Sequence, residues 1–311
     1  MAAKKESKKL MSKKPTIIYV MSDKRSGSTL LENILSKSNE CFSVGELALL
    51  EGHLKKEGPG EKWNWNCACG SPFTECVFWS SIVKESYGQN QTDFATNIAW
   101  NFKSKGLIMN AFASSSLAKK LLAVIDKPAN KKVTATLEKL YSLIHLQSGK
   151  SFIVDSSKTP FQALAIYKKI TGFDVKIIWL KRDLRAIVTS KMKWKSVNKK
   201  KEKSMLKLLM DVFYLKKLCY TVFKMAKPAD VLELHYEDLA KNPQQELDKI
   251  FNKFGLEPYK APEFMELSED HTIAGTPGRF TKRPIQYDES WKQQYQNNKL
   301  AYWVGGVLNG L

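Results

Sequence analysis

Small and basic residues gather in one short loop, DKRSGSTLL at residues 23–31, between an apolar run and an amphipathic segment. A loop that leads from a buried strand into a helix points backbone N–H groups and the positive end of the helix dipole at one spot. Gly27 permits close approach of a ligand, and Ser28 and Thr29 add hydroxyl donors. The loop therefore predicts a binding site for phosphate or a similar tetrahedral anion.

The loop differs from the ATP-binding loop of kinases and ATPases. That loop has the pattern G-x-x-x-x-G-K-[ST], in which the lysine reaches the outer phosphates and the hydroxyl holds Mg²⁺. Here the tripeptide SGS precedes Thr29, the basic residue Arg25 lies before the glycine, and Lys24 lies three residues before it. We expect an anion site that needs no metal. A P-loop nucleotide-dependent kinase or phosphotransferase is the alternative.

A second basic motif, KRDLRAIVTS, follows the apolar run VKIIWL directly. Arg182 lies where the strand would end, and Ser190 lies eight residues further, about two turns into the following helix. The planar guanidinium of Arg182 can bind a dianion, and the Ser190 hydroxyl could turn back toward the same group. The alternative interpretation is a helix-capping pair of Arg182 and Asp183, with Ser190 incidental.

The two motifs, in this order and at this separation, resemble those of sulfotransferases that use 3′-phosphoadenosine 5′-phosphosulfate (PAPS) as co-substrate. RSGSTLL resembles the family's 5′-phosphosulfate loop, which has Lys or Arg at the position of Arg25. The resemblance implies that Arg182 and Ser190 bind the 3′-phosphate. The residues that it implies for the phosphosulfate are Arg25, Ser26, Gly27, Ser28, Thr29 and Leu30.

Other segments resemble the same family, especially its bacterial members, with some likeness to tyrosylprotein and carbohydrate sulfotransferases. VDSSKTPF has Lys158 after a strand, as the family does, and LELHYEDLAKNP resembles a late strand-loop-helix element. GTPGR resembles a GNPxR pattern with Thr276 in place of the usual Asn, which implies that Arg279 approaches the nucleotide. The C-x-C-G…C-x-F-W stretch also resembles one in that subgroup.

This resemblance implies in-line transfer of a sulfuryl group to a hydroxyl or amine of an acceptor, without a metal. Arg25 and Lys158 would stabilise the leaving phosphate. Glu46 is the expected general base, because tyrosylprotein-type sulfotransferases have a catalytic Glu at this distance, 21 residues after the loop Arg. The alternatives are that Glu46 caps or pairs at the head of a helix, and that His53 is the base. The acceptor would be a carbohydrate, small metabolite, lipid or peptide.

The elements that must position these residues follow from four short apolar runs rich in β-branched residues. Helical periodicity follows most of the runs directly, which is typical of buried parallel strands. The runs are TIIYVM (16–21), SFIVD (151–155), VKIIWL (175–180) and DVLELHY (230–236), and the expected helices span 28–37, 161–170, 184–192 and 243–254. The alternation predicts an α/β fold, a P-loop-like open parallel sheet flanked by helices, with its ligand site at the carboxyl ends of the strands.

About 130 residues separate the first two of these strands, too many for a simple crossover. Helical patterns at 115–125 and 133–147 predict an inserted, mostly helical lobe on the acceptor side, at about residues 81–150. The first fourteen residues, MAAKKESKKLMSKK, are expected to form a disordered basic tail. The sulfotransferase domain would then span residues 15–311.

A net charge of +19 favours a polyanionic partner, and a nucleic-acid-binding protein is a further alternative. Much of this charge lies in two lysine-rich stretches, 1–14 and 191–207. A nucleic-acid binder would leave the two anion-binding motifs unexplained, so we expect no nucleic-acid partner. The sequence has neither a signal peptide nor an apolar run of about 18 residues, and we expect a cytoplasmic protein with no stable membrane insertion.

Three of the five cysteines cluster in the aromatic stretch WNWNCACGSPFTECVFW. Cys67, Cys69 and Cys76 could bind zinc if a fourth ligand such as His53 joined them, but standard zinc spacings pair two CxxC units. An odd number of cysteines without a secretory signal favours thiols over a disulfide framework. We expect a packed, aromatic-rich local fold here, and no metal in the anion site.

Overall fold

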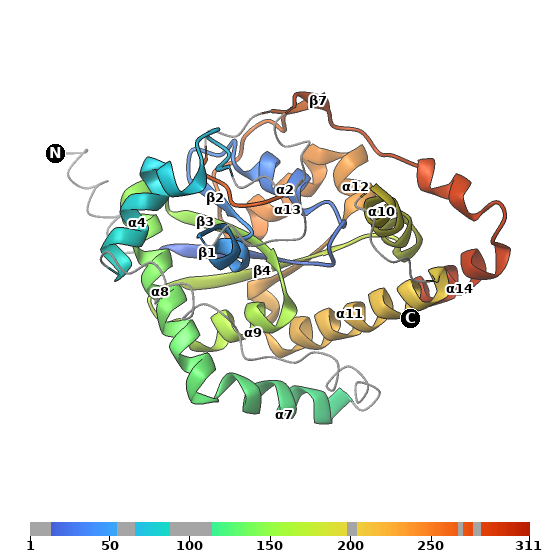
Figure 1. Ribbon diagram of the computed structural model, residues 1–311, viewed down its shortest axis with the longest axis horizontal. Helices are drawn as coiled ribbons and strands as arrows, with labels where there is room; N and C mark the ends of the chain where they lie inside the picture. Colours follow the sequence, from blue (N-terminus) through green and yellow to red (C-terminus); the bar gives the residue numbers. More distant parts are fainter. Residues whose placement is uncertain (1–13, 55–65, 88–113, 198–203, 267–269, 276–280) are drawn as a thin grey trace.

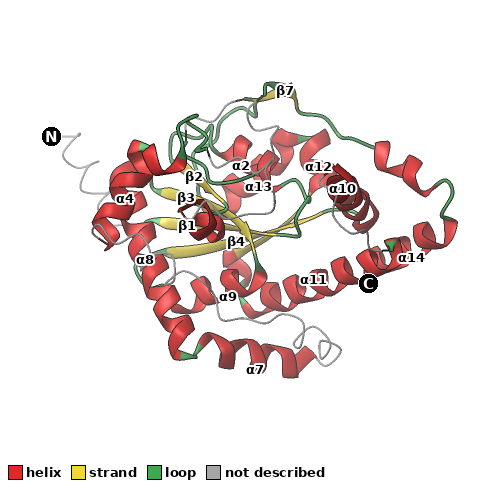
Figure 2. Ribbon diagram, viewed as in Figure 1, coloured by secondary structure: helices red, strands yellow, loops and turns green. Residues whose placement is uncertain are grey.

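Five parallel strands form one open sheet with helices against both faces in the computed structural model (Figure 1, Figure 2). The structure describes residues 14–54, 66–87, 114–197, 204–266, 270–275 and 281–311. The strand order is β2-β3-β1-β4-β5. The strands are β1 (Thr16–Met21), β2 (Cys41–Gly45), β3 (Phe152–Lys158), β4 (Asp174–Lys181) and β5 (Val231–His235).

Helices connect these strands and pack on both sides of the sheet. The α-helices are α2 (Ser28–Leu35), α3 (Leu50–Leu54), α4 (Val77–Tyr87), α7 (Ser114–Ile125), α8 (Pro128–Ser148), α9 (Pro160–Lys169), α10 (Leu184–Val197), α11 (Met205–Met225), α12 (Tyr236–Lys241), α13 (Pro243–Phe254) and α14 (Lys299–Gly310). The short 3₁₀ helices are η1 (Leu47–Leu49), η2 (Phe73–Glu75), η3 (Pro228–Asp230) and η5 (Ser290–Tyr295). A separate two-stranded ribbon pairs β6 (Phe264–Met265) with β7 (Arg283–Pro284).

The core has two layers because successive side chains of a strand point to opposite faces of the sheet. In β1, Ile18 and Val20 pack in the cluster that contains α2 and α13, whereas Ile17, Tyr19 and Met21 pack in the cluster that contains α8, α9 and α11. All six residues of β1 are buried, as expected for a central strand of a parallel sheet. Figure 1 shows these two helical layers on either side of the sheet.

The predicted α/β fold is confirmed, and all four predicted strands are present. Strand β1 and helix α13 have the predicted bounds, and helix α13 runs from Pro243 to the residue before Gly255, whose φ is 74°. Helices α7 and α8 confirm the two helical patterns before β3. Residues 88–113, in the middle of the expected inserted lobe, lie outside the described part of the chain.

The sequence analysis did not predict one strand of the core sheet, β2. Strand β2, with the sequence CFSVG, is short, contains Ser and Gly, and forms an edge of the sheet by pairing with β3. All five of its residues are nonetheless buried, because α2 packs against the strand and Phe78 of α4 packs against Phe42. Tertiary packing therefore decides a strand that local propensity does not predict.

All five strands end at the same edge of the sheet because all of them are parallel. The residues that follow β1, β2 and β4 therefore lie near one another although they are far apart in sequence. Among the described helices, none combines the length and the apolar character needed to cross a membrane.

Candidate active site

The loop between β1 and α2 has a conformation that only small residues tolerate at its last position. Gly27 has a φ of 91°, and a Cβ atom placed there would lie 2.2 Å from Cδ2 of Tyr236. Arg25 also has a positive φ, of 76°, which costs a non-glycine residue about 1–3 kcal/mol. Such strain at a ligand loop indicates that the surrounding structure holds the backbone in a fixed shape.

The loop presents several unpaired donors. Helix α2 begins at Ser28, so the N–H groups of Ser28 and Thr29 have no carbonyl one turn earlier within the helix. The hydroxyl oxygen of Ser26 is buried and has no hydrogen-bond partner within the described part of the chain. The N–H of Leu30 already donates to the carbonyl of Gly27 at 2.9 Å, and the Leu30 side chain packs in the core. The remaining donors fit a tetrahedral anion.

The second predicted motif meets this loop through three polar contacts. The Nε of Arg25 donates to Oγ of Ser190 at 2.8 Å, and the guanidinium of Arg182 donates to the carbonyl oxygen of Arg25 at 2.8 Å. Lys191 pairs with Asp23 at 2.6 Å, with the carboxylate almost fully buried. These contacts join residues more than 150 positions apart, and they bring the two anion-binding motifs into one site.

Arg182 is held by an aromatic ring rather than by an acid. Its guanidinium carbon lies 4.2 Å from the centre of the Tyr236 ring, at the junction of β5 and α12. Asp183 accepts a hydrogen bond from the N–H of Arg185 at 2.8 Å and so caps α10, as the alternative interpretation allowed. Its ion pair, however, is with Arg185 at 2.6 Å and not with Arg182. The Nε of Arg182 is buried and unpaired within the described residues. Arg182 therefore keeps a donor for a ligand.

Tyr236 is a site residue that the sequence analysis missed. Its ring contacts both Gly27 of the DKRSGSTLL loop and the guanidinium of Arg182 in the KRDLRAIVTS motif, so it links the two motifs. The signal for it was its position at the end of a predicted parallel strand, where ligand-contacting residues concentrate.

A second missed residue is Arg283, in β7. Burial lowers the pKa of Arg25, and the nearby positive charges of Arg182 and Arg283 lower it further. The guanidinium groups of Arg182 and Arg283 thus repel that of Arg25, and an anion bound beside Arg25 would relieve that repulsion. The predicted nucleotide contact Arg279 lies outside the described residues.

The predicted general base and the lysine of the third motif form an ion pair. Nζ of Lys158 lies 2.7 Å from Oε1 of Glu46, and the two side chains are 10% and 14% exposed. Lys158 ends β3 with a φ of 73°, whereas Glu46 directly follows β2 and donates its N–H to the carbonyl of Ile273 at 2.8 Å. Glu46 is the N-cap residue of η1, but its side chain makes no capping hydrogen bond there. The ion pair with Lys158 is the pairing that the structural alternative for Glu46 also allowed.

A further carboxyl group, that of Glu32, interacts electrostatically with both members of this pair. Glu32 of α2 is buried and accepts a hydrogen bond from Oγ of Ser156 at 2.6 Å. Burial raises its pKa to about 7, although hydrogen bonds from Ser156 and Ser43 and the charge of Lys158 act in the opposite direction. The sequence analysis did not single out this residue, because an acid in an amphipathic helix normally lies on the exposed face.

The alternative base His53 is part of the core. It is 1% exposed, its Nδ1 lies 3.0 Å from the carbonyl oxygen of Leu49, and its ring packs edge-on against Phe73. Its structural surroundings therefore favour Glu46 as the base.

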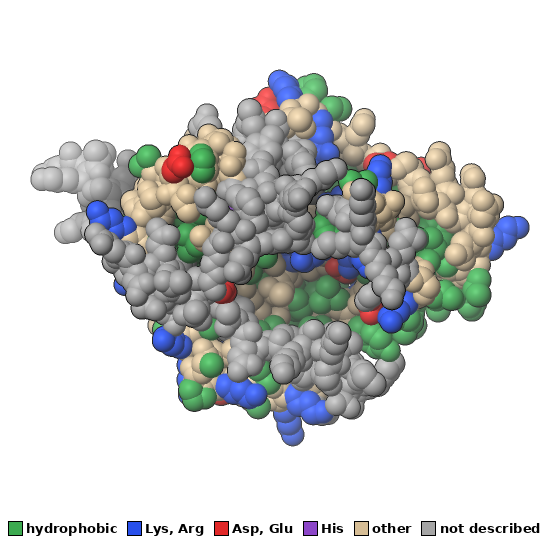
Figure 3. Space-filling view, in the orientation of Figure 1, with side chains coloured by type: hydrophobic (Ala, Val, Ile, Leu, Met, Phe, Trp, Pro, Cys, Tyr) green, Lys and Arg blue, Asp and Glu red, His purple; other side chains and the backbone are tan. Residues whose placement is uncertain are grey.

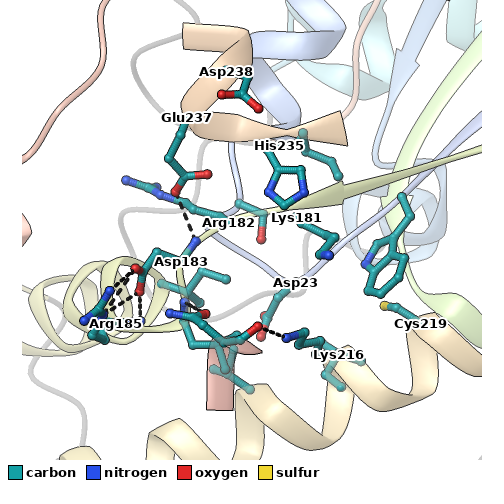
Figure 4. Close-up of a pocket in the computed structure, with 18 of the residues that line it drawn as sticks. Asp23, Lys181, Arg182, Asp183, Arg185, Lys216, Cys219, His235, Glu237 and Asp238 are labelled. Carbon is teal, nitrogen blue, oxygen red and sulfur yellow. Dashed lines mark hydrogen bonds and ion pairs between the residues drawn. The ribbon is translucent and has the colours of Figure 1, made fainter. Parts of the chain in front are cut away.

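A cavity of about 390 Å³ adjoins the two anion-binding motifs. Ser26 and Arg182 line one part of it, and Trp179 and Cys219 contribute apolar wall. Burial lowers the pKa of Lys216 in this cavity to about 8. Figure 4 shows the acidic and basic side chains around the cavity, with Asp183 and Arg185 joined by an ion pair. In the space-filling view of Figure 3, the surface has a hollow in which hydrophobic and basic side chains are visible.

Comparisons with known proteins identify the family of the chain. A family model described as "Sulfotransferase family" matches residues 82–261, more than half of the chain. The chain belongs to the sulfotransferase family. The family expected from the sequence motifs is thereby confirmed. The matched range includes Lys158 and the KRDLRAIVTS motif, whereas the DKRSGSTLL loop and Glu46 lie before it.

Solved structures of sulfotransferases are similar to this chain over most of its length. The sulfotransferase domain from the curacin biosynthetic pathway is 18% identical with a TM-score of 0.52, covering 96% of this chain and 99% of its own. The sulfotransferase domain of the olefin synthase of Synechococcus PCC 7002 is 16% identical with a TM-score of 0.48, covering 96% of each chain. A sulfotransferase from Mycobacterium tuberculosis H37Rv is 12% identical with a TM-score of 0.44, covering 83% of this chain and 72% of its own. At such identity the likeness concerns the fold alone. No relative was found among curated proteins.

Proposed function

We propose that this sulfotransferase takes its sulfuryl group from PAPS and transfers it to a hydroxyl or amine of an acceptor, by in-line displacement without a metal. The observation that carries the proposal is the 2.8 Å contact between Nε of Arg25 and Oγ of Ser190. The 5′- and 3′-phosphates of PAPS belong to one ribose, so a protein that binds both needs two anion sites side by side. The contact between the two motifs supports that arrangement.

Each phosphate has its own set of proposed ligands. The phosphosulfate would bind Arg25 and the donors of Ser26 to Thr29, including the buried, unpaired hydroxyl of Ser26. The 3′-phosphate would bind Ser190 and the free Nε of Arg182. Arg279 is a proposed nucleotide contact because of the resemblance to the family. Arg283 is a second proposed contact, because its positive charge acts on Arg25.

The proposed chemistry uses the pair of Glu46 and Lys158. The Glu46 carboxylate takes the proton of the acceptor hydroxyl, and the acceptor oxygen forms a bond to sulfur. The bond between sulfur and the bridging oxygen of the 5′-phosphate breaks, and that oxygen keeps the electron pair. Lys158 and Arg25 stabilise the resulting negative charge. The products are the sulfated acceptor and adenosine 3′,5′-bisphosphate.

The acceptor class remains the one expected from the resemblance, a carbohydrate, small metabolite, lipid or peptide with a hydroxyl group. The cavity beside Ser26 and Arg182 has both apolar and charged walls, which suits an amphipathic acceptor or the nucleotide base. The kinase alternative requires Mg²⁺ and a triphosphate, and the experiment below separates it from the main proposal. The cytoplasmic location stays a prediction.

The test measures thermal stabilisation of the full chain by adenosine 3′,5′-bisphosphate and by PAPS, without added Mg²⁺. We expect both to raise Tm, and ATP with Mg²⁺ to raise it much less. Arg182→Lys keeps the charge but loses the planar guanidinium. It should lower the affinity for adenosine 3′,5′-bisphosphate about tenfold or more and so reduce the bisphosphate-induced rise in Tm. The exposed Lys253→Ala on α13 is the matched control and should behave as the unmodified chain.

A stabilisation by ATP with Mg²⁺, and none by either PAPS or the bisphosphate, would refute the proposal and support the kinase alternative. A screen of hydroxylated acceptors with labelled PAPS then identifies the acceptor class.

A further inference from the structure

Three cysteines and one histidine converge in a cluster of which neither anion-binding motif is part. The cluster consists of Cys67, Cys69, Cys76 and His271, and one ligand atom from each lies within 4.8 Å of all the others. The sequence analysis named His53 as an example of a fourth ligand for these cysteines. The structure brings His271 to them instead, from about 200 residues away in the sequence.

Three of the separations between the donor atoms are close to the edges of a tetrahedron of zinc ligands. Sγ of Cys69 lies 3.8 Å from Sγ of Cys76, and Nδ1 of His271 lies 3.6 Å from Sγ of Cys67 and 3.2 Å from Sγ of Cys76. With Zn–S near 2.3 Å and Zn–N near 2.0–2.1 Å, tetrahedral geometry gives edges of about 3.5–3.8 Å. Two of these separations equal such an edge, the one between His271 and Cys76 is shorter, and all four donors lie within 4.8 Å of one another, close enough to share one ion.

The local backbone is shaped to bring the sulfur atoms together. The N–H of Gly70 donates to the carbonyl of Cys67 at 2.9 Å, and the φ of 89° at Gly70 closes a tight turn that contains Cys69. Asn66 and Pro72 form a bridge that brings the chain back, and Cys76 lies at the start of α4. This turn does what a CxxC turn does in common zinc sites, with one residue fewer between the first two cysteines.

The histidine is held in place by contacts outside the cluster. Its ring stacks on Phe78 with centres 4.8 Å apart and planes 3° from parallel, and its carbonyl accepts a hydrogen bond from Nε1 of Trp79 at 2.6 Å. Cys67 and Cys76 are buried, whereas Cys69 is exposed. Aromatic residues thus fix the orientation of the ring with Nδ1 toward the sulfur atoms, as supporting residues do around metal ligands.

We propose that Cys67, Cys69, Cys76 and His271 bind one structural zinc ion in a tetrahedral site. Three soft thiolates and an imidazole are the ligands that zinc prefers over magnesium or calcium. All four positions are filled by the protein, so the ion has no open position for substrate and serves the fold. The inference does not depend on PAPS, because it concerns the donor set alone.

The ion would fasten two distant parts of the chain beside the proposed base. Directly after His271, the carbonyl of Thr272 accepts from the N–H of Ala68 at 3.3 Å. Ile273 then pairs with the end of β2, accepting from the N–H of Glu46 at 2.8 Å. A metal bound at His271 therefore ties this segment to the cysteine turn and supports the residue that bears the carboxylate.

The experiment measures zinc in the full chain, purified without a polyhistidine tag under reducing conditions. We expect one zinc per chain by elemental analysis, and a cobalt-substituted protein with the strong visible bands of tetrahedral thiolate coordination. Cys69→Ser removes the exposed ligand and should reduce zinc retention at least tenfold, with a lower Tm. Cys219→Ser, a buried cysteine outside the cluster, should retain zinc fully and controls for loss of a thiol.

Should Cys69→Ser perturb folding, His271→Cys offers a second variant, since a fourth thiolate keeps a zinc-binding set and should retain the metal. The inference is overturned if the reduced protein, offered zinc, holds far less than one ion per chain. It is equally overturned by equal zinc in the Cys69→Ser and Cys219→Ser proteins, or by a Cys69–Cys76 disulfide in freshly purified protein. None of these readouts requires sulfotransferase activity, so failure of the PAPS proposal would leave the zinc result unaffected.

Discussion

At the scale of single residues, the ion pair of Glu46 and Lys158 combines the two functions that sulfuryl transfer needs. The proposed base and the lysine proposed to stabilise the leaving phosphate already lie 2.7 Å apart, at the ends of adjacent strands β2 and β3. Arrival of an acceptor hydroxyl and a phosphosulfate would give each of them a new partner.

Glu46→Gln tests the role of the carboxylate. The amide keeps the size of the side chain but cannot take a proton, so kcat should fall about 10²–10⁴-fold. The bisphosphate-induced rise in Tm should remain, because the phosphate ligands are untouched. Glu257→Gln, at an exposed position, is the matched control. Full activity in Glu46→Gln would move the base to another residue.

Buried Glu32 predicts a pH dependence of stability. Its pKa is about 7 in the folded protein and 4.5 in an ordinary exposed carboxyl. The folded protein therefore keeps a proton that the unfolded chain releases, and the free energy of unfolding should fall as pH rises from about 4.5 to 7. This contribution amounts to about 3 kcal/mol over the whole window. Ser156, Ser43, Lys158 and Glu46 are the groups that act on it.

Urea unfolding of Glu32→Gln and of the unmodified chain at pH 5 and pH 8 measures the effect. The stability of the unmodified chain relative to Glu32→Gln should be lower at pH 8, because the variant has no charge to bury. Other carboxyl groups titrate alike in both proteins and cancel. A difference that does not change with pH would show that Glu32 titrates normally.

At the scale of elements, the junction of β1 and α2 is the part of the site that depends most on its backbone. Arg25 and Gly27 both have positive φ, and Gly27 also packs against the ring of Tyr236 from the distant β5–α12 junction. The loop is thus shaped both by its own small residues and by an element more than 200 residues further along the chain.

Gly27→Ala and Gly149→Ala separate these two causes. Gly149 ends α8 with a φ of 66° and has open space around it, so alanine there should cost only the backbone strain of about 1–2 kcal/mol. Gly27 has the same strain and a clash with Tyr236, which should add about 1–3 kcal/mol and weaken bisphosphate binding. The measurements are urea unfolding and the bisphosphate shift in Tm. Equal behaviour of the two variants would mean that the Tyr236 contact is unimportant.

At the scale of the whole molecule, the described site lies at the carboxyl ends of the sheet strands, with Arg283 contributed by the separate β6–β7 ribbon. The three guanidinium groups, the α2 N-terminus and the ion pair all belong to residues after position 20. The basic residues of the site are therefore enough to explain anion binding, and the lysines of the N-terminal stretch are not required for it.

Removing residues 1–13 tests this separation. The deletion removes five lysines but no described residue, so bisphosphate binding and Tm should stay close to those of the full chain. A large loss of bisphosphate affinity would instead give the basic N-terminal stretch a direct part in binding. Measuring the same variant against single-stranded DNA at low and moderate salt checks the nucleic-acid alternative.

Much of this protein follows from local sequence. The alternation of β-branched runs with helical periodicity determined four of the strands and their helices, because burial on both faces requires continuous apolar runs. The DKRSGSTLL loop and the KRDLRAIVTS motif could be identified from the sequence, because anion binding restricts both the type and the spacing of residues. Tertiary structure alone decided the rest. Strand β2, Tyr236, Arg283, Glu32 and His271 gain their roles from neighbours far away in the sequence, and no local pattern encodes which distant side chain arrives at a given edge of the sheet.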